Sequence, residues 1–315
     1  MDKSSTNAIE KAVKNIQLCH VELEELIPKY RKKIEELEAK LQPNEEKLSG
    51  RYWRLVAYVD SLTKLRLFVE QNFKFIETMV VLSVTRYVLE LSVWMKLLIN
   101  DETYGLVYQY QLMEKQLHYY TDLENHLAKE TEFFKEIHKK ESDLIDKKVL
   151  EAQNIQDKEE SALALANVAH SVQRIIDDDA AKRLCIYIDD ALTKGYGYQA
   201  HLISQIAIPK AREGKTIIRK EIDSLRRMLP KDIKELVKEG WNWKRKAKDA
   251  GMIDEYEFIY SYTSRLMHAT PVSLTTDQKN LEYKEIVMFL RYIFIRMKEC
   301  ISDAEKLLGN NENLH

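Results

Sequence analysis

The 315-residue chain is long enough to bury a large hydrophobic core in one or two domains. Its 49 basic and 51 acidic residues give a formal net charge of -2. This balance argues against a protein that coats nucleic acid through a uniformly basic surface, but it allows a local basic cleft. With only 8 Gly, 5 Pro and 32% charged residues, the composition favours long amphipathic helices.

The first predicted element is a helix with a heptad pattern between residues 9 and 41. We expect residues 1–48 to form a helical extension whose apolar seam packs against another helix, of the same chain or of a second copy. Pro28 removes a backbone donor inside the pattern and predicts a kink or a break. His20 lies in the seam, either as a metal ligand or pH switch or, as we favour, as a polar residue that sets the register. The seam consists of Ile9, Val13, Ile16, His20, Leu23, Ile27, Tyr30, Ile34, Leu37 and Leu41.

A long apolar-periodic region follows from Tyr52 to Ile99. Its most apolar part, residues 79–99, contains Arg86, Glu90 and Lys96, which a membrane span holds only at considerable cost. We therefore expect a buried core helix and no membrane partner.

The middle of the chain is helical in period but much more charged. Residues 106–158 are predicted to form a charged helical hairpin inserted into the main domain, with most of its charge on a solvated face. A buried helix is expected to begin with SALALANVAH at 161–170 and to run to about Thr193. A further helix from about Gln199 to Leu229 is expected to bend at Pro209.

The last third of the chain also favours helices. Pro230 is placed to begin a helix, another covers Asp254 to His268 and ends before Pro271, and a last one reaches Leu308. No stretch alternates as a strand does. We predict an all-α fold, a multi-helix bundle over residues 49–309 with a coiled-coil-like N-terminal extension and a disordered tail at 310–315.

The cysteines and the N-terminus indicate a cytoplasmic protein. Cys19, Cys185 and Cys300 are scattered without metal-ligand spacing and are expected to be reduced, buried thiols. The first residues do not resemble a signal peptide. No metal-binding or nucleotide-binding motif occurs together with the flanking elements that it requires. We therefore expect no metal and no cofactor.

Two groups of polar residues are candidates for a functional site. In the apolar helix at 79–99, the spacing of four residues places Arg86 and Glu90 on one stripe. The pair is either a structural ion pair that fixes helix packing or an anion clamp in which Arg86 faces phosphate and Glu90 orients a partner.

The second group lies on the helix that begins near Tyr256. Ser264, Arg265 and His268 share its polar arc. The arc is either a plain solvent-facing helix end or a site edge at which these side chains bind a phosphodiester and move a proton.

Three motifs together resemble a bacterial family of unknown function over about residues 50–305. They are R-x-x-x-E at Arg86 and Glu90, W-x-W-K-x-K-A-x-x-A-G from Trp241 to Gly251, and Y-x-x-x-S-x-x-x-H-A-x-P from Tyr260 to Pro271. That family is similar to the HEPN superfamily of helical domains. Many members are metal-independent endoribonucleases of toxin–antitoxin and anti-phage systems, with an arginine and a histidine near a helix end that act across a dimer.

The resemblance implies an endoribonuclease or toxin effector of bacterial stress and anti-phage defence. His268 is then the general acid/base, Arg265 and Arg86 stabilise phosphate charge, and Glu90 belongs to the same catalytic group. Arg265 and His268 are closer in sequence than the superfamily's pair, since Ser261 to Thr263 occupy the places of its arginine.

The implied RNA-binding residues lie on both later motifs. Ser264 and Tyr260 give hydrogen-bonding support, and Trp241, Lys244 and Lys246 line the approach of single-stranded RNA by stacking and charge. The implied partners are RNA and, through helices, a second copy or another protein. The alternative is a non-catalytic sensor or interaction module that assembles through its heptad.

Overall fold

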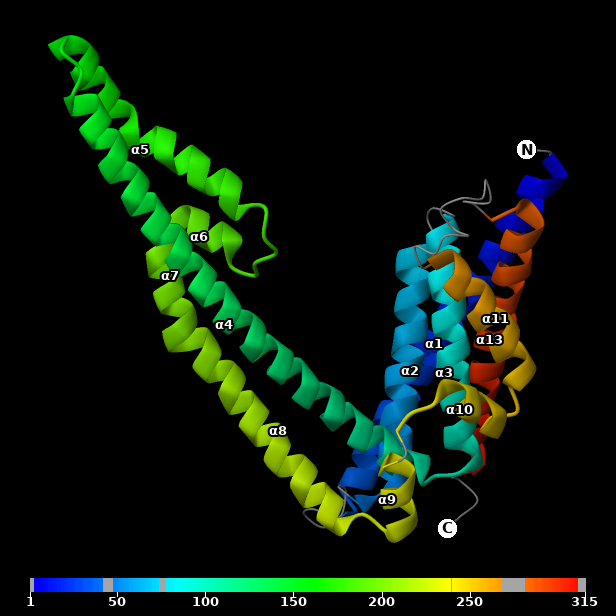
Figure 1. Ribbon diagram of the computed structural model, residues 1–315. Helices are drawn as coiled ribbons and strands as arrows, with labels where there is room; N and C mark the ends of the chain where they lie inside the picture. The colour runs from blue at the N-terminus through cyan, green and yellow to red at the C-terminus, as the bar shows by residue number, and fades with distance from the viewer. Residues whose placement is uncertain (1–2, 42–47, 74–76, 239, 268–280, 311–315) are drawn as a thin grey trace. The chain divides into compact units, whose positions relative to one another are not determined.

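The computed structural model describes residues 3–41, 48–73, 77–238, 240–267 and 281–310. Within these ranges the chain forms helices, turns and loops and no strand, which confirms the predicted all-α bundle (Figure 1). The chain divides into two compact units. Unit 1 is Met1–Gln111 with Leu225–His315, and unit 2 is Leu112–Ser224.

Unit 1 is a helical bundle in which helices from both ends of the chain lie together. In it α1 packs against α2 and α13, and α3 packs against α2, α13, α11 and α10. The first residues of α4 also belong to this unit. The helices are α1 (Lys3–Glu38), α2 (Gly50–Asn72), α3 (Thr78–Asn100), α4 (Tyr104–Gln153), α9 (Lys231–Lys238), α10 (Trp243–Asp249), α11 (Ile253–Met267) and α13 (Tyr283–Asn310).

Helix α3 is at the core of unit 1. By length and composition it is apolar enough to cross a membrane, but 56% of its most apolar window is buried inside the protein. Its side chains Val81, Leu89 and Leu98 are fully buried. Helices α2, α10, α11 and α13 all pack against α3.

The predicted heptad seam is the buried face of α1. Ile16, Leu23 and Tyr30 are fully buried, and the Tyr30 hydroxyl donates a hydrogen bond to the carbonyl oxygen of Ala304 on α13 at 2.9 Å. These seam residues therefore pack within their own chain. Helix α1 continues through Pro28 without the predicted break, with the proline ring on the exposed side.

His20 in this seam faces α2. Its Nε2 lies 2.9 Å from Oε1 of Glu70, and this hydrogen bond lowers the pKa of the Glu70 carboxyl. His20, Glu24 and Glu70 together have the geometry of a metal group, but Arg66 forms ion pairs with both carboxylates, at 3.8 and 2.6 Å. The guanidinium of Arg66 already neutralises these two carboxylates, so we interpret the cluster as a polar contact between α1 and α2.

Unit 2 is built on the rest of α4, a 50-residue helix. Helix α5 runs back along the C-terminal part of α4, and α8 runs along a part of α4 nearer its N-terminus (Figure 1). The Lys140–Asp179 ion pair joins α4 to α5, and Glu124 joins it to α8 through Arg212 and Lys215, both at 2.9 Å. The elements of this unit after α4 are α5 (Lys158–Ala180), α6 (Ile188–Lys194), α7 (Tyr196–Leu202), the π-helical turn η2 (Ile203–Ala207) and α8 (Ile208–Met228).

The predicted bend at Pro209 appears as a change of helix type. The π-helical turn over Ile203–Ala207 ends two residues before Pro209 and contains Gln205, whose carbonyl a proline ring displaces in a regular helix. The wider turn accommodates the ring, and the helix continues as α8.

The division of the chain differs from the predicted boundaries in two respects. Helix α1 belongs to the bundle instead of forming a separate extension at 1–48, because α2 and α13 cover its seam. The inserted segment spans 112–224 instead of 106–158, because α5 to α8 pack with α4. Of the predicted tail at 310–315, residues 311–315 lie outside the described residues.

The three cysteines do not share one environment. Cys19 and Cys300 are buried, and burial raises the pKa of each thiol to about 11. Cys185 is only partly buried, which corrects the expectation for that residue, because it lies in the loop between α5 and α6.

Candidate functional site

The candidate site lies where α11 crosses α3 in unit 1. The Nε of Arg86 donates to Oε1 of Glu90 at 3.2 Å, one helical turn away on α3. The side chains are 22% and 24% exposed, so the pair is less buried than the apolar helix around it suggested. It forms the predicted ion pair and still reaches solvent.

Helix α11 completes the surroundings of Arg86. The Nη1 of Arg86 donates to the hydroxyl of Ser264 at 3.3 Å, and the guanidinium lies 4.3 Å from the ring centre of Tyr260. Tyr256 stacks on Tyr260 from the preceding turn, with ring centres 4.8 Å apart. An aromatic face holds a guanidinium by cation–π attraction, so α11 fixes both the plane and the position of the Arg86 side chain.

The structure thus brings together Arg86, Glu90, Tyr260 and Ser264, which the sequence placed in two motifs. Arg265 lies on the same helix, with its guanidinium 5.3 Å from the ring of Tyr262. His268 falls outside the described residues, directly after Met267 at the end of α11.

The Trp241 to Gly251 motif has a different environment from the predicted RNA approach. Trp241 stacks on Trp94 of α3 at 3.9 Å, and Lys246 is 2% exposed with its Nζ donating to the Tyr104 hydroxyl at 3.0 Å. Lys246 serves packing, because a buried ammonium with a hydroxyl partner is not available to a phosphate, while the half-buried Trp241 has one ring face against Trp94. Lys244 is exposed and pairs with Glu257 of α11 at 2.7 Å.

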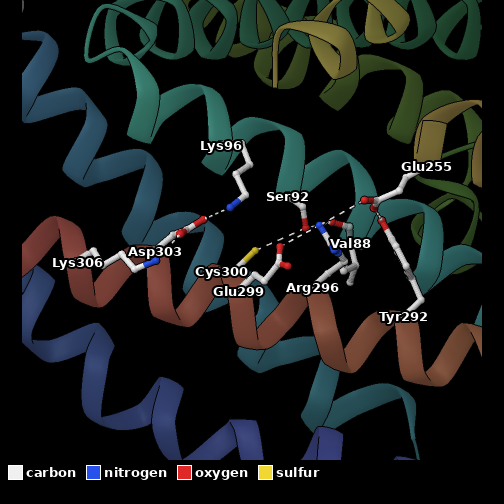
Figure 2. A network of polar contacts seen from close by, with 10 residues as sticks. All are labelled: Val88, Ser92, Lys96, Glu255, Tyr292, Arg296, Glu299, Cys300, Asp303 and Lys306. Atoms are coloured by element: carbon white, nitrogen blue, oxygen red, sulfur yellow. Dashed lines mark hydrogen bonds and ion pairs between the residues drawn. The ribbon is translucent and has the colours of Figure 1, made fainter. Parts of the chain in front are cut away.

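A network of polar contacts joins α3 to α13 and α13 to α11, as Figure 2 shows. Lys96 on α3 binds Asp303 on α13 at 2.6 Å, and Ser92 lies 3.6 Å from the Cys300 sulfur. Glu255, in the first turn of α11, accepts the Tyr292 hydroxyl at 3.0 Å. No motif in the sequence had pointed to this network. The charged residues on the otherwise apolar faces of α3 and α13 are the signal for it.

The network matters for the site because it sets the register of α11. Glu255 also lies 3.6 Å from Nη1 of Arg296, so the start of α11 is bound to two side chains of α13. At the other end, Tyr262 donates a hydrogen bond to Glu285. Desolvation and this hydrogen bond raise the Tyr262 pKa to about 12. Helix α11 is therefore held at both ends while Tyr260 and Ser264 contact Arg86.

This arrangement is suited to binding an anion. Among the described residues, Nη2 of Arg86 has no partner, while Nε and Nη1 are already oriented by Glu90 and Ser264. A guanidinium donates N–H bonds in a planar fork that matches phosphate oxygens. The geometry provides a pre-oriented, partly exposed cation beside a hydroxyl.

Comparison with known proteins identifies a limited match. A family model described as a family of unknown function (DUF5677) matches residues 160–285, which is less than half of the chain. The matched segment begins in α5 and contains α10 and α11, but it does not contain Arg86 or Glu90. No curated protein and no solved structure matches the chain.

Replacing Glu90 by alanine tests whether the pair supports the bundle. The change leaves a partly buried guanidinium without its carboxylate, and we expect the free energy of unfolding to fall by about 1–2 kcal/mol. Urea unfolding followed by circular dichroism measures the loss. Glu25→Ala, at an exposed carboxylate of α1, is the matched control and should leave stability unchanged. A Glu90→Ala protein as stable as the parent would show that Ser264 and Tyr260 alone hold Arg86.

Proposed function

We propose that this protein is a metal-independent endoribonuclease whose phosphate-binding group is Arg86. The observation that carries the proposal is the contact of Arg86 with Ser264 and Tyr260 at 3.3 and 4.3 Å, since it joins the motif on α3 to the helix that leads into His268. The resemblance of these motifs to the HEPN superfamily supports the same reading, including a role in bacterial defence.

Each residue has a stated role in this proposal. Arg86 binds the non-bridging oxygens of the scissile phosphate and stabilises the charge that grows on them, while Glu90 orients it. His268 transfers a proton. Arg265, which is exposed at the end of α11, gives further positive charge, and Ser264 and Tyr260 position the phosphate.

The reaction follows the chemistry of RNA. The ribose 2′ oxygen attacks phosphorus and loses its proton, the bond from phosphorus to the 5′ oxygen breaks, and that oxygen gains a proton. His268 is one of the groups that carry these protons. The products are a 2′,3′-cyclic phosphate and a 5′-hydroxyl, and the reaction needs no oxidant, reductant or metal ion.

The alternative of a module that assembles through its heptad has lost its main support. The seam residues Ile16, Leu23 and Tyr30 are already buried against α2 and α13 of the same chain. Leu18 and Val21, three residues apart on α1 and more than half exposed, form only a small apolar pair outside that seam.

The proposal is tested by incubating the purified full chain with total RNA in EDTA. We expect discrete fragments that end in a cyclic phosphate, at a rate unchanged when magnesium replaces EDTA. Fragments that form only with magnesium and end in a 3′-hydroxyl would contradict the mechanism, and intact RNA in both buffers would contradict the activity.

A further inference from the structure

Unit 1 has a cavity of about 410 Å³ between α2, α3 and the start of α4. Tyr87, Leu91, Trp94 and Leu98 line one wall, at the spacing of four and three that places them on a single stripe of α3. A cavity of this size is typical of small-molecule sites. None of these residues has a role in the site at Arg86.

The α2 residues that line the cavity include both a carboxylate and an ammonium group. Asp60 and Lys64 of α2 line the cavity one helical turn apart, and both are exposed. Asp60 accepts the Tyr108 hydroxyl through Oδ2 at 2.8 Å, while its Oδ1 has no partner among the described residues. The Nζ of Lys64 makes only a distant contact, 5.9 Å from the Phe68 ring centre, within that part of the chain.

The aromatic side chains of the cavity are held in place by other rings. Trp94 is covered by Trp241 at 3.9 Å and meets the Tyr108 ring edge-on at 5.8 Å. Tyr87 meets Phe68 edge-on at 4.7 Å and is still 39% exposed, a large value for an aromatic residue on a core helix. The cavity is thus lined by oriented aromatic groups that remain open to solvent.

We propose that this cavity binds a purine base. A purine stacks on an aromatic wall, donates an amino N–H to the Asp60 carboxylate and accepts a hydrogen bond from Lys64 on a ring nitrogen or carbonyl oxygen. The two fused rings spread these groups far enough apart to reach side chains one helical turn apart. A pyrimidine offers less stacking surface and a shorter span.

The position of the cavity relates it to the site at Arg86. Trp94 follows Arg86 by eight residues on α3, a rise of about 12 Å along the helix. Tyr87 stands between them, and both burial and the nearby Glu90 charge raise its pKa. If the proposed RNA cleavage holds, the cavity selects a purine near the scissile phosphate. The purine binding itself does not depend on that activity.

The test uses the full chain in EDTA with four nucleoside 5′-monophosphates, AMP, GMP, CMP and UMP, and isothermal titration calorimetry. All four carry the same phosphate, so a difference between them reports the base. We expect saturable binding of the two purine nucleotides, and about ten- to a hundredfold weaker binding after Asp60→Asn or Lys64→Gln. Asp143→Asn and Lys29→Gln, at exposed positions outside the cavity, are the matched controls and should bind as the parent does.

Two results would overturn the inference: no saturable binding of any nucleotide at millimolar concentration, or equal binding of purines and pyrimidines that neither cavity variant changes. RNA cleavage measured on the same preparations separates the two proposals. A protein that binds purines and leaves RNA intact retains the cavity site and loses the endoribonuclease. A protein that cleaves RNA and binds no purine retains the endoribonuclease and loses the cavity site.

Discussion

Replacing Leu23 by aspartate should lower the free energy of unfolding by more than about 4 kcal/mol. Leu23 is fully buried in the seam that α1 presents to α2 and α13, so the variant loses its apolar burial and places a carboxylate among side chains that cannot bind it. Urea unfolding followed by circular dichroism measures the effect.

The same helix offers a control for this change. Leu18 is 57% exposed on the outer face of α1, so Leu18→Asp adds the same charge without burying it. Its unfolding midpoint should stay close to that of the parent. If Leu23→Asp is equally harmless, α1 does not belong to the core of unit 1.

Replacing Arg86 by glutamine should reduce RNA cleavage by about a hundredfold or more. Glutamine can still hydrogen-bond to Glu90 or Ser264, so the bundle persists, but the positive charge at the phosphate is gone. Initial rates on a short single-stranded RNA in EDTA measure the loss. Arg291→Gln, an exposed arginine of α13, controls for the lost charge and should retain full activity.

A lysine at position 86 separates charge from geometry. It keeps the positive charge but loses the planar fork and the stacking on Tyr260, so Arg86→Lys should recover only part of the rate. If both substitutions leave cleavage unchanged, the guanidinium serves packing alone and the phosphate binds elsewhere.

The sequence predicted local features better than their partners. The spacing of the seam on α1 predicted that Leu23 and Tyr30 would be buried, since an a/d pattern identifies the apolar face. The same pattern suits a helix of the same chain or of a second copy, so it did not identify α2 and α13 as the partners. The pairing of Arg86 with Glu90 followed from their spacing of four residues.

Contacts between distant parts of the chain were not predictable from these patterns. Ser264 meets Arg86 across 178 positions, and this contact depends on the packing of α11 against α3. Trp241 and Lys246 were predicted to be RNA-binding groups because exposed aromatic and basic residues suit that role. The stacking of Trp241 on Trp94 and the burial of Lys246 beside Tyr104 depend on where α10 and the residues before it pack, which no periodicity in the sequence reveals.

The extent of unit 2 was underestimated for a related reason. The inserted segment was predicted to end at residue 158 because the charged stretch ends there. The less charged α5 was therefore assigned to the main domain, whereas it belongs to unit 2. In the structure the apolar face of α5 packs within unit 2, where Val172 and Ile176 join Phe134 of α4 in one cluster. The composition of a helix shows that it has a buried face but does not show which unit buries it.

The most direct test of the proposed endoribonuclease is the end chemistry of a defined RNA oligonucleotide cut by the parent and by His268→Ala in EDTA. We expect the parent to leave a 2′,3′-cyclic phosphate, and the variant to be about 100- to 10,000-fold slower with an unchanged melting temperature. Equal cleavage by the two proteins, or a product ending in a 3′-hydroxyl, would contradict the account.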